Sequence, residues 1–298
     1  MSLPLSLLLM APALLLLAAV FLWPLLQYAW LSGQASSLLT GLEPIANGGA
    51  NWQRLLGDAR FWQDAVFTLR FALLSVGLEL LLGLAIALLL QRPCRWRGLL
   101  RAVTLLPWAL PGTVMALGWR WIFNDPYGPL NRLIGFFGAD PYGFLSTPSS
   151  TWLFAVIADV WKSTPFVALL LLAGLQSIPR ELEESLVLEG ASRSQILRQL
   201  TLPLLQPWIV LAMLFRLAQA LGLFDLVQVL TRGGPAGSTE SLALYAYLQA
   251  MRFLDFGYSS TLVLATFLLL ALLGLLIWLP FRNRLRLQVS VASEEVRG

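Results

Sequence analysis

Few side chains in this sequence could perform acid–base, metal or nucleophilic chemistry. The chain has 298 residues with no histidine, one cysteine (Cys94) and one lysine (Lys162). The commonest metal ligand and general base is therefore missing, and one thiol forms neither an intramolecular disulfide nor a thiolate metal cage. We predict no catalytic residue and no metal site. Lys162 lies in VWKSTP, which is not a phosphate-binding Gly-x-x-x-x-Gly-Lys-Ser/Thr loop, so the chain cannot bind ATP by that route.

Charged residues in or near the long apolar stretches raise a second possibility, an ion relay across a membrane. They are Glu79, Asp159, Lys162, Arg216 and Asp225. Ionisable groups inside a membrane often mark proton or ion pathways. Most of the five lie close to a predicted helix end, and Glu79 could equally make a hydrogen-bonded contact between helices. An ion-coupled secondary transporter of small polar solutes is therefore an alternative function.

The elements that hold these residues are apolar helices. Hydrophobic residues make up 58% of the chain and charged residues 12%, which is typical of an integral membrane protein. A membrane-spanning helix needs about 20 apolar residues, and six segments qualify: 5–30, 64–90, 99–123, 152–176, 204–230 and 258–281. The first lacks the basic start and cleavage site of a signal peptide. We predict an all-α, polytopic membrane protein with six transmembrane helices.

Arginine positions indicate the orientation, because short cytoplasmic loops are rich in Lys and Arg. One cluster lies between the second and third spans and another follows the sixth: Arg92, Arg95, Arg97, Arg101, Arg282, Arg284 and Arg286. Both regions and both termini are therefore predicted to be cytoplasmic. The net charge of +4 reflects this topology and gives no reason to expect a nucleic-acid partner.

The predicted organisation is one membrane domain. Its parts are an N-terminal transmembrane helix (1–30), an extracytoplasmic loop (31–63), a core of five transmembrane helices (64–281) with a cytoplasmic loop at 178–203, and a cytoplasmic tail (282–298). Within the extracytoplasmic loop, residues 51–61 have the pattern of a short interfacial helix.

The polar stretch 178–207 has a specific internal spacing. Gly190 follows Glu184 by six residues, and Leu200 and Pro203 come ten and thirteen residues after the glycine. Gly190 can adopt the left-handed conformation that ends a short helix. Pro203 suits the first turn of the next helix, because it lacks an amide proton.

The same stretch predicts a docking helix. Leu182, Leu186 and Val187 form one apolar face of a helix that is otherwise acidic. Such a face can lie in the groove of a partner protein. An ordinary amphipathic helix at the membrane surface would also explain the polarity, but it would not require the glycine and proline spacing.

This spacing resembles the EAA motif (E-A-A-x3-G-x9-I-x-L-P) of permeases from binding-protein-dependent ABC importers. In that family the motif forms coupling helices that bind a separate cytoplasmic ATPase. The resemblance assigns ATPase coupling to Glu184, Ser185, Leu186, Glu189, Gly190, Ala191, Leu200 and Pro203. Ser185 and Leu186 replace the usual alanines, Glu189 replaces an aspartate and Leu200 an isoleucine. The larger Leu186 implies an ATPase groove adapted to it.

Further segments resemble MalF-like permeases of sugar importers, in the same order along about 51–281. They are FWQDAVFTLRF (61–71), LLPWALPGTVMALGWRWIFND (105–125), WKSTPFVALLLLAGLQSIP (161–179) and LTRGGPAGSTESLALYAY (230–247). The resemblance implies a type I ABC importer permease fold in a bacterial plasma (inner) membrane. It also implies a second homologous permease, two ATPases that bind ATP and Mg, and an extracytoplasmic sugar-binding protein. This chain would hold no cofactor and would not be an enzyme.

The resemblance places a solute path on helices four to six. Polar residues predicted to line it are Lys162, Ser163, Thr164, Gln219, Asp225, Gln228, Tyr258 and Ser259. Each could equally form a hydrogen bond between helices. Gly233, Gly234 and Pro235 are predicted to contact the binding protein, although a plain connecting turn fits them as well. The scarcity of cationic residues along the path favours a neutral sugar or sugar-like solute.

Overall fold

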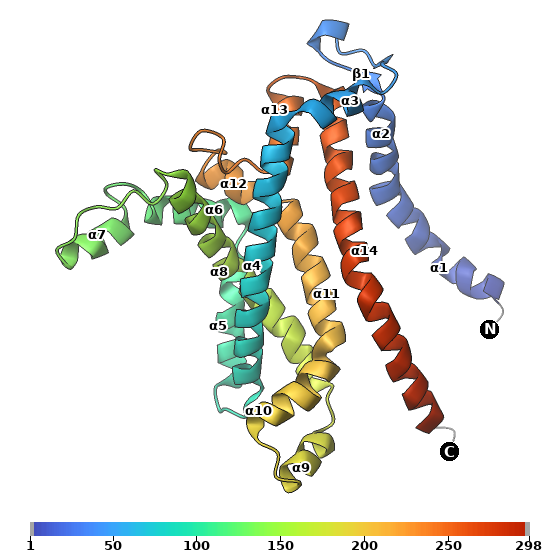
Figure 1. Ribbon diagram of the computed structural model, residues 1–298, viewed down its shortest axis with the longest axis vertical. Helices are drawn as coiled ribbons and strands as arrows, with labels where there is room; N and C mark the ends of the chain where they lie inside the picture. Colours follow the sequence, from blue (N-terminus) through green and yellow to red (C-terminus); the bar gives the residue numbers. More distant parts are fainter. Residues whose placement is uncertain (1–2, 296–298) are drawn as a thin grey trace. The chain divides into compact units, whose positions relative to one another are not determined.

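The computed structural model describes residues 3–295, with side chains described for residues 9–281, and is mostly helical (Figure 1). The α-helices are α1 (Leu3–Leu17), α2 (Trp23–Ser32), α3 (Ala50–Gly57), α4 (Ala59–Gln91), α5 (Arg97–Ala109), α6 (Gly112–Ile122), α7 (Pro129–Phe136), α8 (Pro148–Gln176), α9 (Arg180–Leu188), α10 (Arg193–Ile196), α11 (Leu202–Leu221), α12 (Asp225–Leu230), α13 (Leu242–Met251) and α14 (Phe256–Glu295). Shorter elements are the π turns η1 (Ala18–Leu22) and η3 (Leu197–Thr201), the 3-10 turn η2 (Leu38–Thr40), and the paired antiparallel strands β1 (Gln34–Ala35) and β2 (Ile45–Ala46).

Five helical stretches among the described residues are long and apolar enough to cross a membrane. They are Leu9–Ser32, Ala59–Gln91, Pro148–Gln176, Arg193–Leu221 and Phe256–Phe281. Helices α5 and α6 together pass the same test as one broken span, which gives the sixth. The predicted all-α architecture is therefore confirmed, with six spans when the bent pair is counted as one.

The prediction of one helix over 99–123 is wrong, although the two helices found there can form one broken span. Helices α5 and α6 are bent by 88° at Leu110 and Pro111. The ring of Pro111 disfavours a helical conformation at the preceding residue, and Leu110 accordingly has an extended ψ of 134°. The sequence pattern kept its apolar character through this break, so hydropathy alone did not reveal it.

The prediction of one helix over 204–230 is also wrong. Helix α11 ends at Leu221, and the separate helix α12 begins at Asp225. The helical stretch also starts earlier than predicted, at Arg193. At the C-terminal end, α14 continues through the predicted tail as far as Glu295, and residues 296–298 lie outside the described residues.

The chain divides into two compact units. One contains residues up to Ala65 together with Leu242–Leu269, and the other contains Val66–Ser241 and the residues from Leu270 onward. Apolar side chains from α3, α4, α13 and α14 form the core of the first unit: Leu55, Phe61, Ala65, Leu242, Tyr245, Ala246, Tyr258 and Leu262. Side chains from α4, α8 and α11 form a core in the second: Ala87, Leu90, Val167, Leu171, Leu172, Leu175, Leu205 and Ala212.

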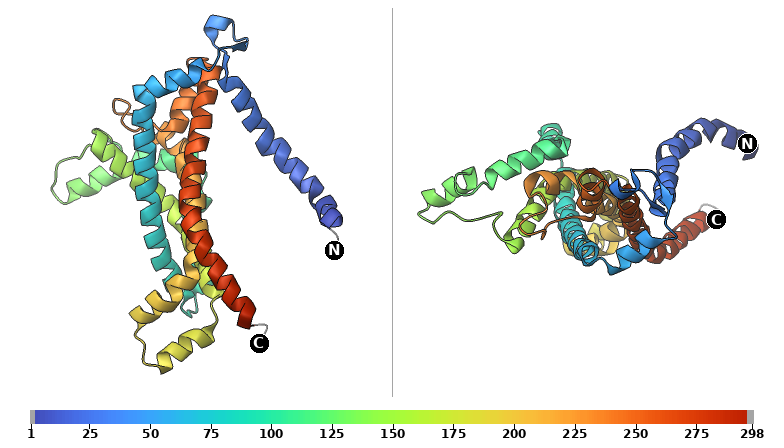
Figure 2. Two further views of the ribbon diagram at one scale, coloured as in Figure 1. Left: turned by 45° about the vertical axis from the view of Figure 1, so that its right-hand side comes forward. Right: turned by 90° about the horizontal axis from the view of Figure 1, so that it is seen from above.

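Two segments of the second unit project from its helices. Figures 1 and 2 show α9 and α10 beyond the ends of α8 and α11, and α7 extending away from α8. The long helices therefore carry the interior contacts, and the α9–α10 connection is left with a free surface in this chain.

Candidate functional site

The coupling segment, which we define as α9, the following turn and α10 (residues 180–196), contains the predicted ATPase-coupling motif. Helix α9 begins after Pro179 and has Glu181 and Glu183 in its first turn. Carboxylates near a helix N-terminus are stabilised by the helix dipole. The acidic composition that marked this segment in the sequence thus favours the helix itself, in addition to keeping the segment soluble.

A left-handed glycine ends α9, as the sequence predicted. Gly190 has a φ of +86°. Its N–H donates to the carbonyl of Val187, and the N–H of Ala191 donates to the carbonyl of Leu186, at 3.0 and 2.9 Å. These two bonds form a Schellman motif, which satisfies carbonyls that a helix end would otherwise leave unpaired. The turn direction is therefore set by backbone bonds that depend on Gly190.

A side-chain cap starts the next helix two residues later. The Ser192 hydroxyl accepts a hydrogen bond from the Gln195 N–H, and the Gln195 side chain accepts one from the Ser192 N–H. This reciprocal pair is a capping box, which fixes the first turn of α10. The coupling segment is thus fixed locally on both sides of Gly190.

The apolar face of α9 differs in detail from the prediction. Leu182 and Val187 are exposed, at 44% and 56%, whereas Leu186 is half-buried. Leu188 is 89% exposed, and the sequence pattern did not single it out. Three apolar side chains on this short acidic helix are therefore exposed and available to a partner protein.

Pro203 lies in the first turn of α11, as predicted, but α11 continues an earlier helical stretch. The helical stretch runs without a break from Arg193 to Leu221 and passes through the π turn η3, where the Leu202 N–H bonds to the carbonyl of Leu197. Pro203 follows directly, so its missing N–H falls where the regular α-helical bonding is already interrupted. Leu200 lies within the π turn and is half-buried. The prediction that Pro203 lies near the start of α11 is confirmed, but the π turn was not foreseen.

A buried ionic cluster joins three helices of the second unit. We call Glu79 (α4), Asp159 (α8), Arg216 and Gln219 (both α11) the Arg216 cluster. The guanidinium of Arg216 donates to both carboxylate oxygens of Glu79, at 2.5 and 2.8 Å, and to Oδ2 of Asp159 at 3.0 Å. Its remaining terminal nitrogen donates to Oε1 of Gln219 at 2.6 Å. Because a guanidinium is planar, this bidentate contact fixes its orientation.

Burial makes the pairing within this cluster obligatory. The side chains of Arg216, Glu79 and Asp159 are 3%, 0% and 9% exposed. An isolated charge at such a site would cost several kcal/mol. The hydrogen-bonded interhelical contact predicted for Glu79 is therefore confirmed, and Asp159 and Arg216 are its partners. The sequence named Arg216 only as a candidate for an ion relay, and its partners, which are 137 and 57 positions away, could not be read from the sequence.

The other polar residues predicted on α8 are engaged differently. Ser163 and Thr164 are buried, and the Thr164 hydroxyl donates to the carbonyl of Val160 in its own helix at 2.6 Å. Lys162 is half-buried. Thr164 directly precedes Pro165, so its back-bond lies next to the position where the proline lacks an N–H.

Helix α12 holds two further predicted path residues. Asp225 lies in its first turn and is exposed, and Gln228 is half-buried. The Asp225 side chain packs against Gly112 at the start of α6, so closely that a Cβ on residue 112 would lie 2.7 Å from Oδ2. Glycine at 112 therefore permits the carboxylate to approach the N-terminus of α6, where a negative charge is favoured.

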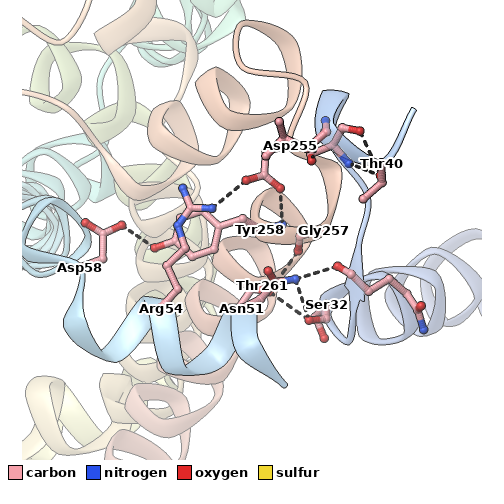
Figure 3. Close-up of polar contacts among 12 residues, drawn as sticks. Ser32, Thr40, Asn51, Arg54, Asp58, Asp255, Gly257, Tyr258 and Thr261 are labelled. Carbon is pink, nitrogen blue, oxygen red and sulfur yellow. Dashed lines mark hydrogen bonds and ion pairs between the residues drawn. The ribbon is translucent and has the colours of Figure 1, made fainter. Parts of the chain in front are cut away.

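Tyr258 and Ser259 lie in the first unit, and Figure 3 shows Tyr258 within a polar set that also contains Arg54, Asp58 and Asp255. The Tyr258 hydroxyl donates to Asp58, and the Ser259 hydroxyl donates to the carbonyl of Ala246 at 2.8 Å. Arg54 lies over the Tyr258 ring and pairs with Asp255 at 2.7 Å. These contacts join α3, α13 and α14, and both predicted residues act in them as packing partners.

Asp58 was missed by sequence reasoning although it is the centre of that set. Burial raises the pKa of its carboxyl, but hydrogen bonds from Tyr245, Tyr258 and the backbone of Phe61 and Arg60 lower it to a net value below the usual range. Burial and the Asp58 contact in turn raise the pKa of Tyr245 to about 12, so this phenol stays protonated as a donor. Only the fold brings these residues together, since Asp58 and Tyr245 are 187 positions apart.

The loop predicted to contact the binding protein, at Gly233–Pro235, is held by hydrogen bonds within the loop. The Gly234–Pro235 bond is cis, and Gly233 has a φ of +81°. The Thr239 hydroxyl oxygen lies within hydrogen-bond distance of the Gly234 carbonyl, at 2.6 Å, and of the Thr231 hydroxyl, at 2.8 Å. The loop is thus internally bonded, a property that both a docking loop and a connecting turn can have.

Comparison with known proteins identifies the family of this chain. Residues 79–280 match the family described as the binding-protein-dependent transport system inner membrane component. The match covers more than half of the chain and includes the coupling segment and the Arg216 cluster. The chain therefore belongs to this family, and it is a multi-pass membrane permease of a transport system.

Individual relatives are similar over most of their length. The trehalose/maltose transport system permease protein MalF of Thermococcus litoralis is 38% identical over 262 residues, which cover 88% of each chain. The sulfoquinovosyl glycerol transport system permease protein SmoG of Agrobacterium fabrum is 37% identical over 267 residues, 89% of this chain and 86% of that protein.

A solved structure shows the same fold. A chain in the crystal structure of a bacterial ABC transporter involved in import of the acidic polysaccharide alginate matches with a TM-score of 0.79, over 94% of this chain and 95% of that chain. Its sequence is 19% identical, so this match concerns the fold alone. The predicted type I ABC importer permease architecture is confirmed.

Proposed function

We propose that this permease forms, with a second homologous permease, the path for a neutral sugar or sugar-like solute in an ATP-driven ABC importer. An extracytoplasmic binding protein would deliver the solute, and two separate ATPase subunits would bind ATP and Mg and hydrolyse the ATP. The transporter would lie in a bacterial plasma (inner) membrane, with both termini of this chain cytoplasmic. Family membership supports the class, and the names of the relatives, trehalose/maltose and sulfoquinovosyl glycerol permeases, support a sugar-like solute.

The coupling segment is the observation that carries this proposal. It projects from the helices, is fixed by the Gly190 turn and the Ser192 cap, and presents Leu182, Val187 and Leu188 to a partner. A helix anchored in this way can transmit a push or pull from an ATPase to α8 and α11 as a rigid body. The membrane helices would then alternate access to the solute path.

The charge of the Arg216 cluster supports a neutral solute. Arg216 is buried and bonded to two carboxylates, so it offers no free cation to an anionic solute. Lys162 is the one cation among the predicted path residues. The same pairing weakens the alternative of ion-coupled transport, because Glu79 and Asp159 are bound to Arg216 and family membership does not favour that alternative.

The decisive experiment is co-purification followed by reconstitution. The chain should bring with it a second permease and an ATPase. In liposomes, the assembly should take up trehalose or maltose with ATP and binding protein present, and the chain alone should be inert under an ion gradient. Uptake by the chain alone under a proton or sodium gradient, without ATPase, would contradict the proposal.

A further inference from the structure

A short basic turn joins two membrane-spanning stretches of this chain. Helix α4 ends at Gln91 and α5 begins at Arg97, so residues 92–96 make the whole connection. Helix α4 is long and apolar enough to cross a membrane, and α5 is so together with α6. A connection this short cannot leave the membrane surface, which is the level of the lipid phosphates. Figure 1 shows it at the same end of the second unit as the coupling segment.

The arginines of this turn have no counter-charge. We define the basic turn as residues 92–101, and its arginines are Arg92, Arg95, Arg97 and Arg101. The turn contains no acidic residue, and among the described residues no carboxylate lies within ion-pair distance of any of the four. The first three are exposed, and Arg101 is half-buried. The described part of the chain therefore leaves all four charges unpaired.

Arg101 also lacks hydrogen-bond acceptors where it is shielded from solvent. Its Nε and Nη2 atoms are buried, and neither has a partner among the described residues. Such a donor is costly, because it loses its hydration without a replacement. An acceptor from outside the chain would remove this cost. Because the residue as a whole is half-buried, an anion at the surface can reach the guanidinium.

The same charges are unfavourable for helix α5. Its first turn holds Arg97 and no acidic residue, and no side chain caps it. A positive charge at a helix N-terminus opposes the helix dipole, whereas an anion there is favoured. Helix α9 has the opposite arrangement, with Glu181 and Glu183 in its first turn. An external anion would thus offset both the unpaired guanidinium and the basic start of α5.

Apolar side chains alternate with the arginines and indicate which anion fits. Trp96 is 63% exposed, and Leu99 and Leu100 are exposed as well. Indole rings settle at the boundary between lipid headgroups and acyl chains. Arginine stems can lie along apolar surface while the guanidinium reaches the phosphates. This mixture fits a lipid better than a free anion or an acidic protein surface.

We propose that the basic turn binds the headgroup phosphate of an anionic phospholipid. Arg97 and Arg101 are one helical turn apart on α5 and donate to the phosphate oxygens, and the other two arginines add attraction. The lipid supplies the acceptor that Arg101 lacks, and Trp96 lies beside its acyl chains. The inference rests on the membrane location of α4 and α5 and not on the transported solute.

The test is a lipid titration of the full chain in a neutral detergent. Phosphatidylglycerol, phosphatidylcholine and inorganic phosphate are the probes, and native mass spectrometry counts the bound lipid. We expect phosphatidylglycerol to bind at least about tenfold more tightly than phosphatidylcholine, since several arginines attract its net charge. It should also raise the unfolding temperature, because a ligand of the folded state stabilises that state.

Two variants locate the site. Arg97→Gln and Arg101→Gln each remove one charge and keep a long polar side chain, and we expect each to weaken phosphatidylglycerol binding by about fivefold. Arg97 is exposed, so its variant tests the proposal even if Arg101→Gln does not fold. Arg132→Gln in α7 and Arg252→Gln after α13 remove the same charge at exposed positions elsewhere, and they should bind the lipid normally.

Three outcomes would overturn the inference. The first is equal affinity for the two lipids, or unchanged affinity in Arg97→Gln and Arg101→Gln. The second is displacement of the lipid by an equal concentration of inorganic phosphate, which would identify a free-anion site. The third is loss of ATPase co-purification from Arg97→Gln with normal lipid binding, which would assign the basic turn to the ATPase. A failure of the proposed function is distinguishable, because lipid binding is measured without transport.

Discussion

The coupling segment and the Arg216 cluster are both polar interruptions of an apolar chain, but different forces hold them. The coupling segment is exposed and is fixed by bonds between neighbours in sequence, at Gly190 and at Ser192. The Arg216 cluster is buried, and its contacts span up to 137 positions. The first can therefore change partners without unfolding the chain, whereas the second must stay paired.

The coupling segment and the Arg216 cluster are suited to different tasks. A locally fixed helix with exposed apolar side chains is suited to bind and release a separate protein. A buried network that joins α4, α8 and α11 is suited to keep three helices in one arrangement. Four substitutions test this difference, from the largest expected effect to the smallest.

The largest effect is expected from Gly190→Pro. Proline cannot adopt a φ near +86° and has no N–H for the Val187 carbonyl, so the turn after α9 cannot form. We expect ATP-dependent uptake to fall at least about 100-fold, as a misdirected α9 no longer seats on the ATPase. Gly190→Asn, which tolerates left-handed backbone, is the matched control and should keep most activity. Normal uptake by the proline variant would show that the turn is not part of the coupling.

The second effect concerns stability. Arg216→Leu leaves the Glu79 and Asp159 carboxylates buried without their cation, and we expect a loss of about 3–5 kcal/mol in the free energy of unfolding. Unfolding of the protein in detergent, followed by circular dichroism, measures it. Arg54→Leu breaks a more exposed ion pair with Asp255 and should cost about 1 kcal/mol or less. Similar losses in the free energy of unfolding would show that the buried ion pairs of Arg216 stabilise the chain no more than an exposed pair.

The third effect is on partner affinity without a change in stability. Leu188→Asp places a charge on a side chain of α9 that is 89% exposed. If this side chain enters an ATPase groove, affinity for the ATPase should fall by about tenfold, the scale of one buried leucine. Leu39→Asp, at a leucine that is 98% exposed in the first unit, should leave affinity unchanged. Equal affinities for Leu188→Asp and wild type would exclude this residue from the interface.

The smallest effect is pH-dependent and lies in the first unit. The pKa of Asp58 is lowered in the folded chain, so the resulting stability is present above its ordinary pKa and is lost as the pH falls through the lowered value. Tyr245→Phe removes one stabilising hydrogen bond and should cost about 1 kcal/mol at pH 7. The difference from wild type should shrink below about pH 4. Unfolding at pH 7 and pH 3 checks this, with Tyr127→Phe, at an exposed tyrosine, as control. A difference independent of pH would show that Asp58 does not accept this bond as a carboxylate.

Much of the coupling segment could be predicted from sequence because its determinants are local. Gly190, its helix and the acidic first turn lie within a dozen residues, and the glycine conformation follows from the absence of a Cβ. The π turn before Pro203 was not predicted, since no residue type signals it. The six apolar segments were predicted for a similar reason, because the length of a span follows from the thickness of a bilayer.

The sequence by itself therefore determined the class of protein, the apolar segments and the position of the coupling segment. The break at Leu110 has a local cause, the ring of Pro111, that hydropathy does not register, whereas the tertiary structure decided the end of α11 at Leu221 and the partners of Arg216. Hydropathy averages over a window and does not detect a bend whose flanks are equally apolar. Charge pairing depends on distance in space. Only the packing of α4, α8 and α11 therefore shows that Arg216 is paired with Glu79 and Asp159, and that it also bonds to the exposed Gln219.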